Sequence, residues 1–155
     1  MTTLYVLVGV PGSGKTTWIG QQMFDWTNTV IVSTDNHVEQ YARSVGKTYS
    51  EVFKDYMPTA IDLMSETAVE AFKNNKVVIW DQTSTTAKTR ARKLRMTPKH
   101  YTKVAVVFKT PAPEQHAKML DRPGKNIPDE IVQDMINRFE YPTAEEGFDR
   151  IINAN

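Results

Sequence analysis

The sequence contains no cysteine, which excludes disulfide bonds and thiolate metal sites. It also lacks an excess of charge of either sign, because 19 Lys and Arg residues stand against 18 Asp and Glu residues. Overall charge therefore neither favours nor excludes a nucleic-acid partner. No apolar run approaches the length of a membrane span, and no basic segment precedes an apolar one at the N-terminus. We expect a cytoplasmic protein with no secretory signal and no membrane partner.

The overall composition is that of an ordinary globular protein. Of the 155 residues, 40% are apolar and 24% are charged, as in a water-soluble domain with a proper core. The sequence shows no internal repeat and no low-complexity segment. We expect a single domain over residues 1–155.

A glycine-rich loop after the first apolar run is the clearest motif. Gly9 to Thr16 matches G-x-x-x-x-G-K-[ST], between a predicted strand at 3–8 and a predicted helix. Such a loop points backbone N–H groups at a phosphate, Lys15 reaches the β- and γ-phosphates, and Thr16 offers its hydroxyl to Mg²⁺. A turn that binds nothing is disfavoured, because every fixed position matches. The expected nucleotide contacts are Gly12, Ser13, Gly14, Lys15, Thr16 and Thr17.

Strand and helix patterns alternate along the rest of the chain. Apolar β-branched runs predict strands at 29–33, 76–81, 104–108 and 148–152. Helical patterns occupy about 15–26, 38–45, 49–74, 87–96, 110–121 and 128–140. We expect Pro58 to break or kink the long helix, and Ile61 and Ile131 to lie on buried helix faces. The alternation predicts an α/β fold, with a parallel sheet that carries helices on both faces.

Two carboxylates follow predicted strands, where ligand groups sit in open α/β sheets. Asp35 is either a functional group or the N-cap of the next helix, and we favour a chemical role because other capping residues surround it. Asp81 ends an apolar run in the manner of a Walker B strand, which would put it near magnesium. An Asp that only caps the following turn explains Asp81 equally well.

Cations gather in two segments. Seven Lys or Arg residues and no acid lie between Lys88 and Lys103, which is either a solvated helix face or a phosphate-backbone surface. The loop at about 121–128 is placed like the lid of a small phosphotransferase. Such a lid would bring Arg122, with Lys125 as a second candidate, onto the transferred phosphoryl group.

These motifs together resemble the polynucleotide 5′-kinase family, and in particular the kinase domain of phage-type polynucleotide kinase/phosphatase. The resemblance rests on the P-loop, Thr34-Asp35, Trp80 to Thr83, the Arg122 lid, and the ending F-E-Y-P-T-A-E-E-G-F-D from Phe139 to Asp149. It implies an adenylate-kinase-like P-loop fold with parallel strand order 2-3-1-4-5. It also implies transfer of the γ-phosphoryl group of ATP, with Mg²⁺, to a 5′-hydroxyl of DNA or RNA, as in nucleic-acid repair. For a phage-encoded protein the location would be the host cytoplasm.

The resemblance further implies roles for single residues. Asp35 would be the general base on the acceptor hydroxyl, and Thr16 would ligate magnesium. Lys15 and Arg122 would stabilise the transition state. The chain lacks the D-x-D-G-T phosphatase motif, so we expect a kinase without a phosphatase domain.

On the acceptor side, Thr83 would lie near the acceptor's 3′-phosphate and Ile127 would pack on its base. Family members usually carry an arginine three residues after the base, where this chain has Val38. Another cation would have to bind the acceptor phosphate, or the acceptor lacks that phosphate. The candidate cations are Arg43, Arg90 and Arg92.

Three functions therefore remain open. The first is a polynucleotide 5′-hydroxyl kinase, and the second is a kinase of the same fold that acts on a small alcohol or nucleoside. The third is an ATP-binding regulatory module without an acceptor, although Asp35 and the cationic lid argue against it.

Overall fold

The structure, a computed structural model, describes residues 2–155. The strands are β1 (Thr3–Val8), β2 (Thr29–Val32), β3 (Val77–Trp80), β4 (Thr102–Val107) and β5 (Arg150–Asn153). The helices are α1 (Lys15–Gln21), α2 (Thr34–Ser44), α3 (Tyr49–Lys73), α4 (Ala87–Met96), α5 (Pro113–Leu120) and α6 (Asp129–Asn137), with a 3₁₀ turn at Ala144–Glu146.

The five strands form one sheet in the order β2-β3-β1-β4-β5, and every pairing is parallel. This confirms the predicted α/β class and the predicted strand order. β1 is central because it is apolar on both faces: Leu4 and Val6 face one layer and Leu7 faces the other. The carboxyl ends of β1, β2 and β3 therefore share one edge of the sheet, where the P-loop, Asp35 and Asp81 begin.

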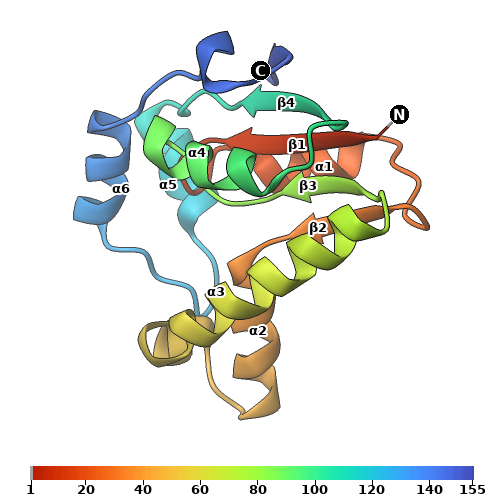
Figure 1. Ribbon diagram of the computed structural model, residues 1–155. Coiled ribbons are helices and arrows are strands. Elements are labelled where there is room, and N and C mark those ends of the chain that lie inside the picture. The colour runs from red at the N-terminus through yellow and green to blue at the C-terminus, as the bar shows by residue number, and fades with distance from the viewer. Residues whose placement is uncertain (1) are drawn as a thin grey trace.

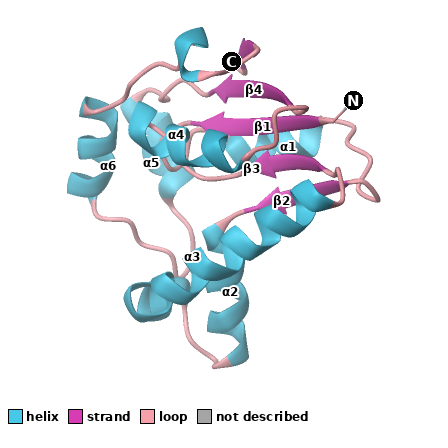
Figure 2. Ribbon diagram, viewed as in Figure 1, coloured by secondary structure: helices cyan, strands magenta, loops and turns pink. Residues whose placement is uncertain are grey.

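Helices cover both faces of the sheet (Figures 1 and 2). α3 and α4 lie on one face, where Met64, Phe72 and Trp80 join the larger core cluster. α1 lies on the other face, where Ile19 packs against Leu7 and Phe108. The loop from α5 to α6 leaves the main body, runs to the start of α3 and returns (Figure 1). None of the helices in the described part of the chain has the length and apolar character of a membrane-spanning helix.

Two helix boundaries differ from the prediction by four residues or more. α1 ends at Gln21 rather than near Trp26, because the chain turns back so that Phe24 packs edge-on against Tyr5 and Trp18. The Asp25 carboxylate then accepts bonds from both the N–H and the hydroxyl of Thr27, which fixes a turn. α2 begins at residue 34, four residues earlier than expected, because Ser33 caps it.

The interior of two helices also differs from the prediction. α3 is one helix from Tyr49 to Lys73, so Pro58 does not break it, and the predicted kink stays a prediction. On α6 the buried residue is Val132, and Ile131 is 49% exposed. Ile61 on α3 is likewise exposed, and the neighbouring Ala60 is buried instead. The rest of the apolar face predicted for α3, which is Met64, Ala68, Ala71 and Phe72, is buried as expected.

Candidate active site

The P-loop is shaped to receive phosphate. Gly12 and Gly14 have φ values of 72° and 98°, in the left-handed region that residues with a side chain rarely adopt. α1 starts at Lys15 without any side-chain cap, so its first N–H groups remain free for an anion. The Ser13 hydroxyl is buried and has no hydrogen-bond partner among residues 2–155. Thr16 and Thr17 are exposed beside it, so all the expected nucleotide contacts lie at one helix terminus.

Lys15 folds back over its own loop. Its Nζ donates to the carbonyl oxygens of Gly9 and Val10, each at 2.9 Å. Burial lowers the pKa of Lys15 to about 8, although the carboxylates of Asp81 and Asp35 act in the opposite direction. The ammonium is thus held at the phosphate cradle in a partly desolvated state, where an incoming anion would restore its ordinary pKa.

Neighbouring elements hold the P-loop in place. The Gly9 N–H donates to the Thr83 carbonyl at 2.9 Å, which ties the P-loop to the loop after β3. His116 on α5 is buried, and its Nε2 lies 2.7 Å from the Pro11 carbonyl oxygen. A carbonyl only accepts, so Nε2 carries the proton. His116 gave no signal in the sequence, because nothing there indicates that α5 packs on the P-loop.

Asp35 lies within the electrostatic reach of Lys15 and is not the helix cap. The cap is Ser33, whose hydroxyl accepts from the Asn36 N–H. Both Asp35 oxygens are bonded: Tyr49 donates its hydroxyl to Oδ1 at 2.6 Å, and Lys125 donates Nζ to Oδ2 at 2.8 Å. Burial acts to raise the pKa of Asp35, but these two bonds and the Lys15 charge hold it below its ordinary value. Asp35 is therefore ionised at neutral pH and can accept a proton.

Asp81 is the second carboxylate at this edge. Its backbone N–H donates to the Val32 carbonyl, which places it directly beyond the ends of β2 and β3. Burial raises the pKa of Asp81, and the nearby Lys15 partly offsets this effect. Within residues 2–155, no cluster of three or more His, Asp or Glu side chains forms a metal site. A divalent ion here would depend on Thr16, Asp81, water and phosphate oxygens, which is the coordination that Mg²⁺ prefers in kinases.

The lid loop brings its cations to the same place. Arg122 is exposed, and its charge acts on both Lys15 and Asp81. Lys125 bonds to Asp35, as described above. The structure thus brings together five of the side chains singled out in the sequence: Lys15, Asp35, Asp81, Arg122 and Lys125.

The basic helix α4 does not match its expected role at Arg90. That side chain is fully buried, forms a bidentate pair with Glu146 through Nε and Nη2, and donates Nη1 to the Ser84 carbonyl. This contradicts the expectation that Arg90 binds an acceptor phosphate, because its donors are used inside the protein. Lys93 is also buried, over the Trp80 ring. Arg92 is exposed and remains a candidate for a phosphate contact.

Two further residues were expected to contact an acceptor, Thr83 and Ile127. Thr83 is partly exposed in the loop that supports Gly9, and Ile127 is partly exposed on the lid. Val38 is fully buried between α2 and α3, with Ala42 and Val52. A long cationic side chain would not fit at Val38 without disturbing this packing, which accounts for the departure from the family pattern.

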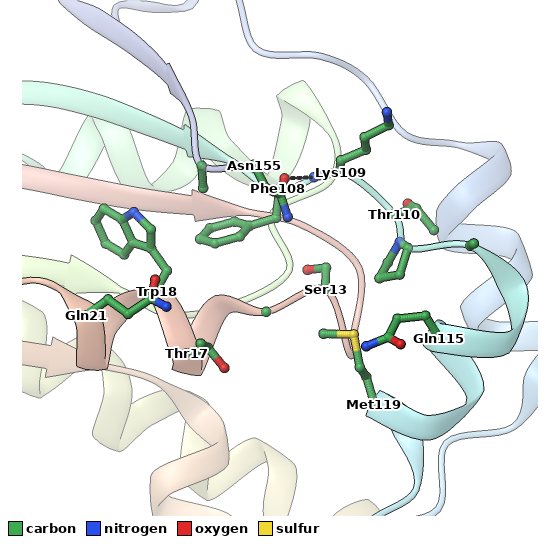
Figure 3. Close-up of a pocket in the computed structure, with 14 residues that line it drawn as sticks. Ser13, Thr17, Trp18, Gln21, Phe108, Lys109, Thr110, Gln115, Met119 and Asn155 are labelled. Atoms are coloured by element: carbon green, nitrogen blue, oxygen red, sulfur yellow. Dashed lines mark hydrogen bonds between the residues drawn. The ribbon is translucent and has the colours of Figure 1, made fainter.

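A cavity of about 650 Å³ adjoins the P-loop (Figure 3). Ser13 and Thr17 line it at the P-loop end, and Trp18, Phe108 and Met119 supply apolar walls. It opens between α1, the end of β4 and α5 (Figure 3). Apolar walls next to a phosphate cradle are suited to a nucleotide's base and sugar.

Comparison with known proteins agrees with this geometry. Residues 4–142 match the sequence family described as AAA domain. No protein in a search of curated sequences is significantly similar. Among solved structures, a chain of the "Pnkp1/Rnl/Hen1 RNA repair complex" aligns with a TM-score of 0.70 and 24% identity, over 96% of this chain and 46% of that chain.

Two further structures share the fold. Shikimate kinase from Acinetobacter baumannii aligns with a TM-score of 0.58 and 18% identity, over all of this chain and 85% of that one. A fungal RNA kinase aligns with a TM-score of 0.54 and 12% identity, over 98% of this chain and 38% of that one. The chain thus spans less than half the length of the RNA-repair chain it resembles. The shared feature is the P-loop kinase fold, which occurs with both nucleic-acid and small-molecule kinases.

Proposed function

The chain belongs to the AAA domain family, and from that premise we propose that it is an ATP-dependent kinase for the 5′-hydroxyl ends of DNA or RNA. The observation that carries the proposal is the position of Asp35. Its side chain is 47% exposed, and it lies within the electrostatic reach of Lys15, the phosphate-binding lysine. A partly exposed, ionised carboxylate opposite a P-loop is what a hydroxyl acceptor requires.

The donor side fits a nucleoside triphosphate. The unpartnered Ser13 hydroxyl, the uncapped start of α1 and the adjoining cavity together suit a phosphate chain and its nucleoside. Thr16 and Asp81 would hold Mg²⁺. ATP with Mg²⁺ supplies the transferable phosphoryl group and neutralises charge on its oxygens. Lys15 would exchange its carbonyl partners for phosphate oxygens, which are stronger acceptors for an ammonium.

On the acceptor side, Asp35 would orient the hydroxyl and take its proton as the new bond to phosphorus forms. The carboxylate retains free lone pairs beyond those used by Tyr49 and Lys125, so it can accept a further hydrogen bond. Arg122 is unpaired among the described residues and would stabilise charge on the transferring group. Each residue would act where charge develops during transfer. Positioning and electrostatic stabilisation of that charge are the main sources of catalysis in phosphoryl transfer.

A nucleic-acid acceptor is favoured over others by two features. Among the three solved structures named above, the RNA-repair chain aligns with the highest TM-score. The exposed cations Lys88, Arg92 and Arg95 lie on α4, directly after the loop that carries Thr83. A strand that enters past Thr83 would meet them through its phosphates.

A small hydroxyl acceptor is the second candidate. It is favoured by Val38, whose burial leaves no cation at the position where the family binds the acceptor phosphate. The alignment with shikimate kinase, which covers 85% of that chain, is compatible with this reading.

Transfer of a labelled γ-phosphoryl group separates these functions. The acceptors are 5′-hydroxyl DNA and RNA oligonucleotides, nucleosides and a panel of sugars, with Lys15→Ala as the inactive control. We expect label on the oligonucleotides only. The Lys15→Ala variant loses one preorganised contact to the phosphates, so its transfer rate should fall on the order of 10²–10³-fold. Label only on small acceptors would replace the proposal by the second candidate. ATP binding with no labelled acceptor would indicate a regulatory module.

A further inference from the structure

The lid loop is fastened to the start of α3. The Ser50 N–H donates to the Gly124 carbonyl at 3.0 Å, and the Asn126 N–H donates to the Ser50 hydroxyl at 2.8 Å. Figure 1 shows the loop running from α5 to this helix end and back to α6. The loop is therefore held to the start of α3, which lies 76 residues away in the sequence at the Ser50–Asn126 contact.

The Lys125 side chain is largely buried between the lid loop and the start of α3. Its side chain is only 11% exposed, although a lysine on a loop would ordinarily extend into water. Its Nζ bonds to Asp35 Oδ2 and lies 4.4 Å from the centroid of the Tyr49 ring. The Tyr49 hydroxyl bonds to the other oxygen of Asp35. One lid residue and one α3 residue thus fix both oxygens of the carboxylate.

The same turn determines where Arg122 lies. Arg122 and Lys125 form an antiparallel bridge, in which the Lys125 N–H donates to the Arg122 carbonyl. Gly124 makes the turn with a φ of 73°, and a side chain there would press on Thr48 at 3.1 Å. Because the turn is short and bridged, the backbone of Arg122 follows that of Lys125.

We infer that Lys125 is a positioning residue, which anchors the lid through Asp35 and Tyr49 and so sets both Asp35 and Arg122 for transfer. The inference rests on the function proposed above. Lys125 acts through its neighbours, because its ammonium is already occupied by the carboxylate and the ring. Tyr49 has the narrower role of orienting the carboxylate, since its hydroxyl bonds to Asp35 and makes no described contact with the lid backbone.

Two substitutions separate anchoring from orientation. Lys125→Met keeps the length of the side chain and removes the ammonium. Tyr49→Phe keeps the ring beneath Lys125 and removes only the bond to Asp35. Matched controls are Lys118→Met, an exposed lysine on α5, and Tyr56→Phe, on the same helix as Tyr49. The measurements are amide hydrogen exchange of Ser50 and Asn126 without substrate, and kcat and KM for transfer.

For Lys125→Met we expect exchange of both amides to rise about tenfold, because a local contact has been released. Its kcat should fall about tenfold or more, with the KM for ATP nearly unchanged, since misplacement of catalytic groups is costly. Tyr49→Phe should leave amide exchange at the wild-type rate and lower kcat. Both controls should match wild type in both measurements.

Wild-type exchange in Lys125→Met would overturn the anchoring role, and wild-type kcat in that variant would overturn the positioning role. An unchanged kcat in Tyr49→Phe would overturn the role of Tyr49. A wild-type protein with no transferase activity would overturn the proposed function and the catalytic part of this inference with it. The exchange comparison needs no substrate and decides the anchoring part separately.

Discussion

Helix α4 and the lid loop each direct a cation at a carboxylate, but the two pairs have different surroundings. Arg90 on α4 is fully buried against Glu146, whose side chain is 15% exposed. Lys125 on the lid bonds to Asp35, whose side chain is 47% exposed. The Arg90 donors are all used inside the protein, whereas the half-exposed Asp35 carboxylate can still accept a further hydrogen bond. The exposure of the partner, rather than the presence of a cation, separates a structural pair from one at a site.

The contacts around each cation support this distinction. The Arg90 guanidinium also donates to the Ser84 carbonyl, so it holds the loop after β3 in shape. Ser84 has a positive φ of 46°, a conformation that costs energy for a residue with a side chain. Arg122 on the lid makes no such internal contact in the described chain, and it remains available at the site.

The largest expected effect is on stability. Arg90→Ala leaves Glu146 without its partner and the Ser84 carbonyl without its donor, so unfolding should become easier by about 3–5 kcal/mol. Arg92→Ala, on the exposed face of the same helix, is the matched control and should stay within about 0.5 kcal/mol of wild type. Urea unfolding measures both. Similar stabilities for the two variants would contradict a structural role for Arg90.

A substitution on the lid loop should lower activity and leave stability nearly unchanged. Arg122→Ala should lower kcat roughly 10²-fold, because it removes charge stabilisation in the transition state. The KM for ATP and the melting temperature should barely change, since the Arg122 side chain is exposed and makes no hydrogen bond or ion pair within the described chain. Arg138→Ala, also exposed, serves as the control. An effect on KM alone would mean that Arg122 binds only ground-state ATP.

A smaller effect concerns Lys93, the second buried cation of α4. Burial lowers the pKa of Lys93 to about 8, so between about pH 8 and the pKa of an unfolded lysine, roughly 10.4, the unfolded chain binds more protons than the folded one. Stability should therefore rise with pH across this window. Lys93→Met should stabilise the protein at pH 7 by about 1–3 kcal/mol and flatten that rise. Unfolding curves at pH 7 and pH 9.5 test this, and an equal pH slope in both proteins would argue against it.

The smallest effect is expected from the exposed face of α4. Neutralising Lys88 and Arg92 together should weaken oligonucleotide binding and lower its salt dependence, with a slope reduced by about 1.4 for a single strand. ATP affinity should not change. Binding titrations at several salt concentrations give the slope. An unchanged slope would leave α4 as a solvated face with no contact to nucleic acid.

The P-loop could be predicted because its residues are contiguous in the sequence. Residues Gly9 to Thr17 include the turn, the start of the helix and the lysine, and the structure has the turn and the helix start where they were expected. The sheet order matches what the family resemblance implies, and the alternation of strands and helices predicts a parallel sheet.

The surroundings of Asp35 could be predicted only in part. Asp35 follows from its place after a strand, but its partners are 14 and 90 residues away, at Tyr49 and Lys125. Tyr49 looks like an ordinary start of a helix. Arg90 and Glu146 lie 56 residues apart, so the basic run around Arg90 could not reveal that one of its charges is satisfied internally. Contacts of this range depend on packing, which local patterns do not contain.

Single-turnover transfer by Asp35→Asn tests the central claim most directly. The variant keeps the size of the side chain, and α2 keeps its cap because Ser33 supplies it. Stability should stay within about 1 kcal/mol of wild type, because the Asn side chain keeps an amide oxygen that can still accept from Tyr49 or Lys125. ATP affinity should persist, and transfer should fall about 10²-fold or more with the loss of the general base. Transfer at the wild-type rate in a folded, ATP-binding Asp35→Asn protein would contradict the proposed mechanism.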